Sequence, residues 1–351
     1  MRRPKLTLRF WLTVITMVLL AVLIFFAWPE IIKAWGLLDQ INLWILALLI
    51  PVQFFSYYAT GGMIFSYLRA KGDLKDVSHW RMTRISLELN FVNHILPSGG
   101  AAGFSYLAWL LGHHGVSPGR STMSQIIRFA LTFISFVVLL IVAAAILVAN
   151  HSINRVTVII CVGLAVICIA AVIGAVTILG NKKRLEKFSG GLTRFVNRVV
   201  SFFTRGKHTA AVASHIIPHF FNELHDDYVA IRRDRKILVK PFVWALVANM
   251  ADVALIWISF WALGYMIDPA LLVVAFGVAS IASAVSITPG GAGVYEAIMV
   301  TFLATSNVPA DIAIAGTLLA RVTLVVGTIL FGYVLYQLTV MKYGKSPIKR
   351  Q

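Results

Sequence analysis

Five ionisable side chains lie in stretches of this sequence that are otherwise apolar: Glu88, Arg128, Asp252, Glu296 and Arg321. A charge at the centre of a membrane helix costs about 2.5–3.5 kcal/mol, so each should face a cavity or a partner. Glu296 follows a run of glycines, and Arg321 lies in the last apolar segment. We expect these two to approach one another or to share a bound phosphate. A purely structural ion pair is the alternative interpretation.

The other three charges also have two interpretations each. Arg128 could meet a phosphate or take part in a structural ion pair. Glu88 lies four residues after Arg84 and could sit at the membrane interface rather than in a cavity. Asp252, with Asn249 one turn earlier, could carry a coupling ion or a proton. A hydrogen bond between helices would explain Asp252 equally well.

Two glycine-rich motifs interrupt apolar segments, "PSGGAAG" from Pro97 and "PGGAG" from Pro289. Proline and glycine end a helix and let the backbone turn. The helix that follows begins with free N–H groups and a positive dipole end, which suits an anion such as phosphate. The candidate substrate-binding residues of the motifs are Pro97, Gly99, Gly100, Pro289, Gly290, Gly291 and Gly293.

Three polar residues precede the first motif at helical spacing. Asn90, Asn93 and His94 share one face of the predicted helix, because they stand at positions i, i+3 and i+4. They are candidates for lining a cavity, together with Glu88 and Asp252. Polar contacts between neighbouring helices are the alternative.

The composition identifies an integral membrane protein. The 351 residues are 59% hydrophobic, their mean hydropathy is +0.84, and apolar runs of about 18 residues recur. The net charge of +17 does not indicate nucleic acid, because nearly all Lys and Arg lie between the apolar runs. There they orient a membrane protein and attract anionic lipid head groups. No nucleic-acid partner is expected.

Basic residues in the connections predict the topology. Residues 69–84 hold five Lys and Arg and residues 180–240 hold thirteen, so both are expected in the cytoplasm, with both chain termini. Three apolar segments lie between these connections, and an odd number of full crossings cannot return to the same side. Ile85–Leu111 is the candidate for a re-entrant hairpin, because Pro97 breaks it into arms too short to span. Pro269–Thr305 gives a second hairpin from the outside, although two full spans would satisfy the same parity.

The predicted fold class is therefore an all-α integral membrane protein of about six full transmembrane helices and two re-entrant helical hairpins. Phe10–Trp28 is expected to be an uncleaved first span. The two halves would form an inverted-topology repeat, an architecture in which broken helices build substrate sites near the membrane midplane. One polytopic domain covers residues 1–351, with repeats at about 10–149 and 156–338 and a basic cytoplasmic loop at 180–240.

The sequence also offers a few candidates for catalytic and metal-binding motifs, and none fits. "TRGKHT" at Thr204–Thr209 does not fit a phosphate-binding P-loop. Cys161 and Cys168 lie in one apolar run, and the doublet His113-His114 has no Cys or carboxylate nearby in the sequence. We expect no catalytic residues, no metal, no cofactor and no enzymatic activity.

The motifs are similar to those of a known membrane family. "FVNHILPSGGAAG", "GVSPGR", "TPGGAGVYEA" and "LLAR", with Arg128, resemble the lysylphosphatidylglycerol synthase transmembrane, or flippase-like, family (UPF0104) across most of the chain. The first motif departs from the pattern, because Phe104-Ser105-Tyr106 stands where an acidic residue is expected. The residues that carry the family pattern are Pro289, Gly290, Gly291, Gly293, Glu296 and Arg321.

The resemblance implies translocation of an anionic phospholipid, or of a lipid-linked phosphate, between leaflets of the cytoplasmic membrane. Arg128 and Arg321 would meet the head-group phosphate, and Glu296 would orient an arginine or exclude the wrong head group. Fused family members also transfer lysine from tRNA to phosphatidylglycerol, an activity not expected here because the chain stops at Gln351, soon after the last span. Two alternatives stay open: a transporter of a small soluble solute, and a scaffold for a separate lipid-modifying enzyme as partner.

Overall fold

The computed structural model describes residues 41–95, 101–150, 155–185, 211–285 and 291–344, which contain helices and no strand. The helices are α2 Leu43–Ala47, α3 Leu49–Ala70, α4 His79–Ile95, α5 Ala101–Gly112, α6 Pro118–Ala149, α7 Arg155–Leu179, α9 Ala211–Arg233, the 3₁₀ helix η2 Arg235–Leu238, α10 Val239–Ala262, α11 Pro269–Val285, α12 Val294–Thr305 and α13 Ala310–Tyr343. Within these residues five helical stretches are long and apolar enough to cross a membrane: Leu43–Ala70, Pro118–Ala149, Arg155–Leu179, Arg235–Ala262 and Ala310–Tyr343. The prediction of an all-α, multi-pass membrane protein is confirmed. The expected first span, Phe10–Trp28, lies outside the described residues.

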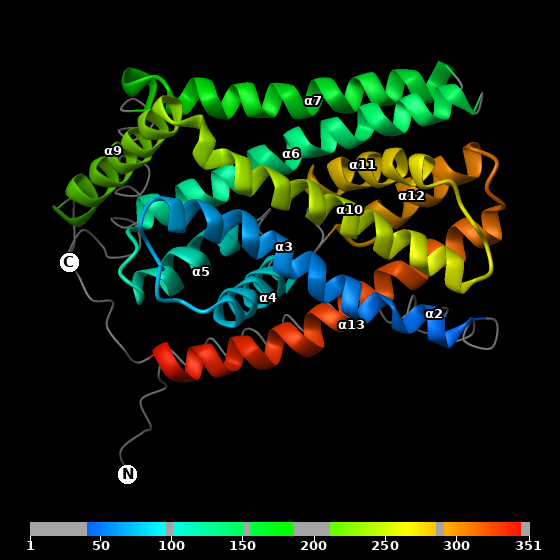
Figure 1. The fold of residues 1–351 in the computed structure, drawn as a ribbon, viewed down its shortest axis with the longest axis horizontal. Coiled ribbons are helices and arrows are strands. Elements are labelled where there is room, and N and C mark those ends of the chain that lie inside the picture. Colours follow the sequence, from blue (N-terminus) through cyan, green and yellow to red (C-terminus); the bar gives the residue numbers. More distant parts are fainter. Residues whose placement is uncertain (1–40, 96–100, 151–154, 186–210, 286–290, 345–351) are drawn as a thin grey trace, which may run out of the picture.

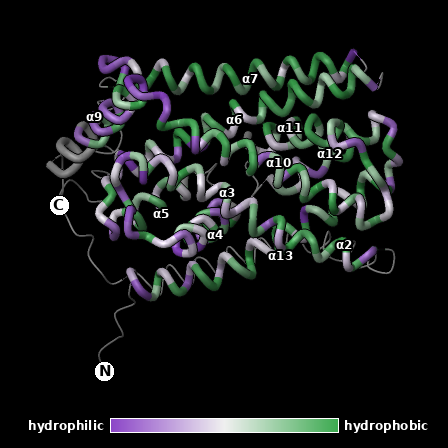
Figure 2. Tube along the Cα trace, viewed as in Figure 1, coloured by the Kyte–Doolittle hydropathy of each residue, from purple (hydrophilic) through white to green (hydrophobic). Residues whose placement is uncertain are grey.

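The long helices pack around α10 and run along the long axis of the bundle (Figure 1). α10 contacts α3, α6 and α13, whereas α7 packs mainly on α6. Figure 2 shows that α7 is hydrophobic along almost its whole length. Its outward side chains, such as Ile159 and Val166, are more than half exposed. Such a surface is stable facing lipid and not facing water.

Local sequence signals fix several helix ends. The side chain of Ser117 accepts a hydrogen bond from the Arg120 N–H, and Pro118 occupies the first turn of α6. Gly264, just past the end of α10, adopts a left-handed φ of 79°. Asp268 then accepts a hydrogen bond from the Ala270 N–H and caps the start of α11.

One end of the bundle, here called the basic end, gathers the connections rich in Lys and Arg. Lys71 follows α3, and its Nζ lies 3.2 Å from Asp227 Oδ1 in α9. The rings of His113, after α5, and Tyr343, at the end of α13, lie 4.9 Å apart. At the opposite end, the backbone N–H of residue 42 donates to the carbonyl of residue 262 over 2.8 Å. The connections predicted to share one side of the membrane therefore lie together.

Each segment predicted to form a hairpin contains two short helices in contact, α4 with α5 and α11 with α12. α4 starts at the basic end, where His79 Nε2 lies 3.2 Å from Arg69 Nη1, and α5 ends there beside Tyr343. α11 and α12 lie towards the opposite end (Figure 1). The arrangement is the one that two hairpins entering from opposite sides require. Their re-entry into a bilayer stays a prediction, and the motif residues 96–100 and 286–290 lie outside the described residues.

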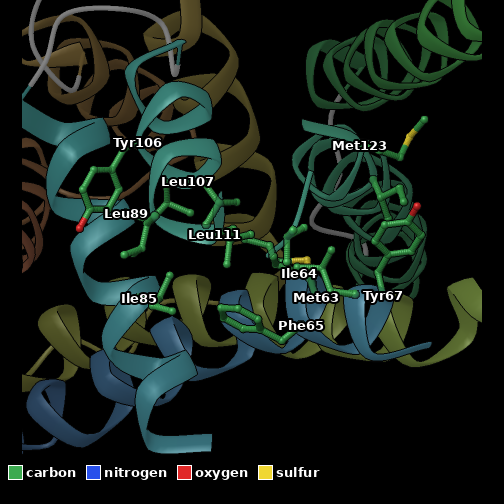
Figure 3. Close-up of a cluster of buried hydrophobic side chains, with 14 of the residues drawn as sticks. Met63, Ile64, Phe65, Tyr67, Ile85, Leu89, Tyr106, Leu107, Leu111 and Met123 are labelled. Carbon is green, nitrogen blue, oxygen red and sulfur yellow. The ribbon is translucent and has the colours of Figure 1, made fainter. Parts of the chain in front are cut away.

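The two largest of four apolar clusters form most of the core of the described residues, and each contains one of the helix pairs. The cluster nearer the basic end joins α3, α4, α5, α6, α9, α10, α13 and the end of α7, and the other joins α6, α7, α10, α11, α12 and α13. Figure 3 shows the first cluster, where apolar side chains from different helices converge: Met63, Ile64, Ile85, Leu89 and Leu107. Each helix pair is therefore anchored to the long helices by its own buried surface.

The helix α9 was not predicted, because its residues were interpreted as part of the basic cytoplasmic loop. Asp227 of α9 is 5% exposed and lies 3.2 Å from Lys71 Nζ and 3.5 Å from Arg120 Nε. The Glu223 carboxylate accepts a hydrogen bond of 3.0 Å from the Gly119 N–H. These contacts hold α9 on the ends of α3 and α6.

Replacing Asp227 by asparagine is expected to lower the stability of the fold by about 2 kcal/mol. Removing one partner of a buried ion pair leaves the other charge uncompensated, and the partial exposure of Arg120 reduces the effect. The measurement is the thermal unfolding midpoint of the purified protein in detergent. Asp226→Asn removes an exposed neighbouring carboxylate and should leave the midpoint unchanged. Equal midpoints for the two variants would contradict an anchoring role for Asp227.

Candidate functional site

An ion pair forms where α12 begins, directly after the second glycine-rich motif. Glu296 Oε1 lies 2.8 Å from Arg321 Nε in α13, and the two side chains are 8% and 13% exposed. The other carboxylate oxygen of Glu296 accepts a hydrogen bond of 2.6 Å from the Gly293 N–H. The prediction that Glu296 and Arg321 approach one another is confirmed.

The start of α12 is shaped by two glycines with left-handed backbone. Gly291 has a φ of 73° and Gly293 a φ of 84°, a region that side chains with a Cβ rarely adopt. A Cβ on Gly291 would also overlap the side chain of Ser283 in α11. Glycine at 291 thus lets α12 begin close against α11, which places Glu296 beside Arg321.

The Glu296 carboxylate occupies the position that an anion would take at this helix start. It accepts from the Gly293 N–H and neutralises the Arg321 guanidinium, whose central carbon also lies 5.0 Å from the Tyr295 ring centroid. A phosphate binding here would therefore have to displace Glu296.

Arg128, the corresponding arginine of the first half, has a different environment. It is half-buried in α6, and its guanidinium carbon lies 4.4 Å from the centroid of the Phe129 ring. That ring stacks on Phe104 of α5 at 5.8 Å, so Arg128 lies beside the helix that follows the first motif. Among the described residues, Arg128 has no ion-pair partner and its Nε has no hydrogen-bond partner. The structural ion pair considered for Arg128 is not found in that part of the chain.

Glu88 is fully buried in a polar cluster that joins α4, α5 and α13. Its carboxylate lies 2.8 Å from Arg84 Nε and accepts hydrogen bonds of 2.7 Å from each of the Tyr106 and Thr339 hydroxyls. Arg84 also donates to Thr339 over 3.0 Å. These contacts favour a structural role for Glu88 over a place on a cavity wall.

Asp252 and Asn249 connect α10 to its neighbours. Ser56 Oγ in α3 donates to Asp252 Oδ1 over 2.6 Å. Asn249 Nδ2 donates to Ser135 Oγ over 2.7 Å and to the Thr132 carbonyl over 3.0 Å, both in α6. These bonds match the interpretation as hydrogen bonds between helices.

The polar residues before the first motif are only partly described. Asn90 Nδ2 donates to the Ser86 carbonyl within α4. Asn93 lies against Gly103, where a Cβ would overlap its amide, so α4 and α5 approach closely at this point. The remaining candidates lie outside the residues whose side chains are described: His94, Pro97, Gly99, Gly100, Pro289 and Gly290.

A further polar cluster between α3 and α13 was missed from the sequence. Gln53 Nε2 donates to Tyr57 Oη over 2.8 Å and to the Leu324 carbonyl over 3.0 Å. The Tyr57 hydroxyl is hydrogen-bonded to that of Thr328. The sequence signal for this cluster is a glutamine inside an apolar segment, and it is weak because glutamine carries no charge. Among the described residues, no group of three His, Cys, Asp or Glu could hold a metal ion.

Comparison with known proteins matches most of the chain to one membrane family. A family model described as the lysylphosphatidylglycerol synthase TM region matches residues 11–332. A UPF0104 membrane protein of Methanothermobacter thermautotrophicus is 27% identical over 265 residues, which cover 73% of this chain and 72% of that protein. A UPF0104 membrane protein of Methanocaldococcus jannaschii is 23% identical over 157 residues, 45% of each chain. No solved structure matches.

Proposed function

Since the chain belongs to the lysylphosphatidylglycerol synthase transmembrane family, we propose that it moves an anionic phospholipid or a lipid-linked phosphate between the leaflets of the cytoplasmic membrane. The protein acts as a transporter and not as an enzyme, and both chain termini are cytoplasmic. The observation that carries the proposal is the buried Glu296–Arg321 pair at the start of a short apolar helix.

Exchange of anions is the proposed mechanism at this pair. The head-group phosphate displaces the Glu296 carboxylate from Arg321 and from the Gly293 N–H. A guanidinium binds phosphate through two parallel hydrogen bonds, because its planar fork of donors matches the geometry of two phosphate oxygens. When the lipid leaves, Glu296 returns and keeps Arg321 paired in its apolar surroundings.

Arg128 supplies a second positive charge in the other half of the chain. Because its Nε has no hydrogen-bond partner among the described residues, a phosphate oxygen would satisfy a donor that is otherwise costly to bury. Both arginines attract a lipid with a net negative charge and so strengthen its binding. A zwitterionic lipid brings its own cation, which weakens this attraction. Selectivity for anionic lipids follows.

The variant Glu296→Gln is expected to slow lipid movement about ten- to hundred-fold while leaving the fold intact. A glutamine cannot neutralise Arg321, so the phosphate leaves more slowly once bound, and a charged hydrogen bond contributes about 1.5–3 kcal/mol. The measurement is the rate at which a fluorescent anionic lipid crosses the membrane of proteoliposomes.

Asp311→Asn is the matched control for that experiment, because it removes an exposed carboxylate from the first turn of α13. Its transport rate should equal that of the unaltered protein. Unchanged transport by folded Glu296→Gln would remove Glu296 from the mechanism.

A further inference from the structure

One face of α3 carries a groove, here called the α3 groove, that the proposed transport site does not use. A pocket of about 380 Å³ opens at the basic end between α3, α4 and α10. A second hollow lies farther along α3, and Tyr58 lines both. The lining residues of α3 recur every three or four positions and so form one stripe: Pro51, Phe55, Tyr58, Gly62, Phe65 and Arg69.

Trp244 of α10 lines the groove beside α3. A Cβ on Gly62 would overlap the Trp244 ring, so the glycine allows the indole to lie directly on α3. Tyr58 meets the same ring edge-on at 5.4 Å. Two aromatic rings in contact with each other therefore line the groove.

The part of the groove that lies at the basic end of the bundle carries positive charge. Arg69 donates from Nη2 to the Val77 carbonyl over 2.6 Å, and its Nη1 lies 3.2 Å from His79 Nε2. Its Nε is buried and has no hydrogen-bond partner among the described residues. Lys240, exposed at the start of α10, lines the same pocket, whose described lining includes no carboxylate. An anion in this pocket would therefore be attracted by the positive charges of Arg69 and Lys240.

The opposite end of the groove is apolar and open. Ile50 is 57% exposed and Phe55 is 49% exposed. Phe54 stacks at 6.0 Å on the ring of Trp80, which is itself 65% exposed. Exposed aliphatic and aromatic side chains at this position suit acyl chains.

The length of the groove matches one leaflet. From Phe54 to Arg69 the helix rises about 22 Å at 1.5 Å per residue. Half of a bilayer with its head groups is about 20–22 Å thick. An occupant with an anionic end at Arg69 and a hydrocarbon tail reaching Phe54 therefore has the dimensions of a phospholipid.

We infer that the α3 groove binds one anionic phospholipid from the leaflet at the basic end. Its phosphate lies between Arg69 and Lys240, and an acyl chain lies along Tyr58 and Phe55. The groove shares no lining residue with the Glu296–Arg321 pair, so this binding does not depend on the proposed transport.

Photolabelling of the full-length protein in detergent tests this site. Phosphatidylglycerol with a diazirine in its acyl chain should label residues 50–58, as mapped by peptide mass spectrometry. Lys240→Gln should lower that labelling about five-fold. Lys236→Gln removes a nearby exposed lysine that does not line the groove, and labelling should be unchanged. Phosphatidylcholine carrying the same diazirine should label these residues weakly.

Three results would overturn the inference. The first is equal labelling by both lipids with no effect of Lys240→Gln. The second is full competition by water-soluble glycerol phosphate, which would indicate a site for free phosphate. The third is a disulfide between Phe55→Cys and a cysteine introduced in residues 10–28, which would show that the N-terminal segment fills the groove.

Discussion

Replacing Glu88 by alanine is expected to lower the stability of the fold by about 3–5 kcal/mol. The carboxylate is fully buried and joins three helices through Arg84, Tyr106 and Thr339. Its loss leaves a guanidinium without its anion and two hydroxyls without their acceptor, and each unsatisfied group adds to the cost. Glu88→Gln keeps the shape of the side chain and part of its hydrogen bonding, so this variant should lose less stability than Glu88→Ala.

The unfolding of purified protein in detergent, followed by tryptophan fluorescence, measures this effect. Asp76→Ala is the control, because it removes an exposed carboxylate at the same end of the bundle. A destabilised Glu88→Ala beside an unchanged control would assign Glu88 to the structure. Full stability together with altered transport would instead place Glu88 on the wall of the substrate cavity.

Replacing Arg321 by alanine is expected to slow lipid movement more than a hundred-fold, at about 1.36 kcal/mol per factor of ten. The variant loses both the charge and the paired donors for the phosphate, whereas Arg321→Lys keeps the charge alone and should retain partial activity. Arg155→Ala, which removes an exposed arginine at the start of α7, should transport normally. The rate of lipid movement in proteoliposomes is the measurement.

The double variant Glu296→Ala with Arg321→Ala separates the two roles considered for this pair. If the pair only pins α12 to α13, removing both charges leaves no uncompensated ion and should restore much of the function. If Arg321 meets the phosphate, the double variant should stay as slow as Arg321→Ala. Restored transport in the double variant would therefore contradict the phosphate role.

The sequence predicted the parts of this fold that depend on hydropathy and charge. The described membrane helices follow from apolar runs, and the basic end follows from the distribution of Lys and Arg. The approach of Glu296 to Arg321 also followed, because two opposite charges in apolar segments need compensation. The re-entrant geometry and the roles of Pro97, Gly99 and Gly100 stay predictions.

Contacts between residues distant in the sequence could not be predicted in the same way. The spacing in the sequence indicates Arg84 as a partner of Glu88, because the two stand one helical turn apart. The other partner, Thr339, is 251 residues away, and no local pattern indicates it. The Gln53 cluster was missed because neutral polar groups hardly change the hydropathy of a long segment. The helix α9 was missed because its position depends on contacts distant in the sequence, both the ion pairs of Asp227 with Lys71 and Arg120 and the apolar packing of Leu224.

The most direct test of the central claim is a comparison of two lipids in proteoliposomes that contain the purified protein. Fluorescent phosphatidylglycerol and a zwitterionic lipid with the same fluorophore are followed from one leaflet to the other. We predict that the protein accelerates the anionic lipid and has a much smaller effect on the zwitterionic one. No acceleration of either lipid by folded protein, or equal acceleration of both, would contradict a translocase that recognises an anionic head group through Arg321 and Arg128.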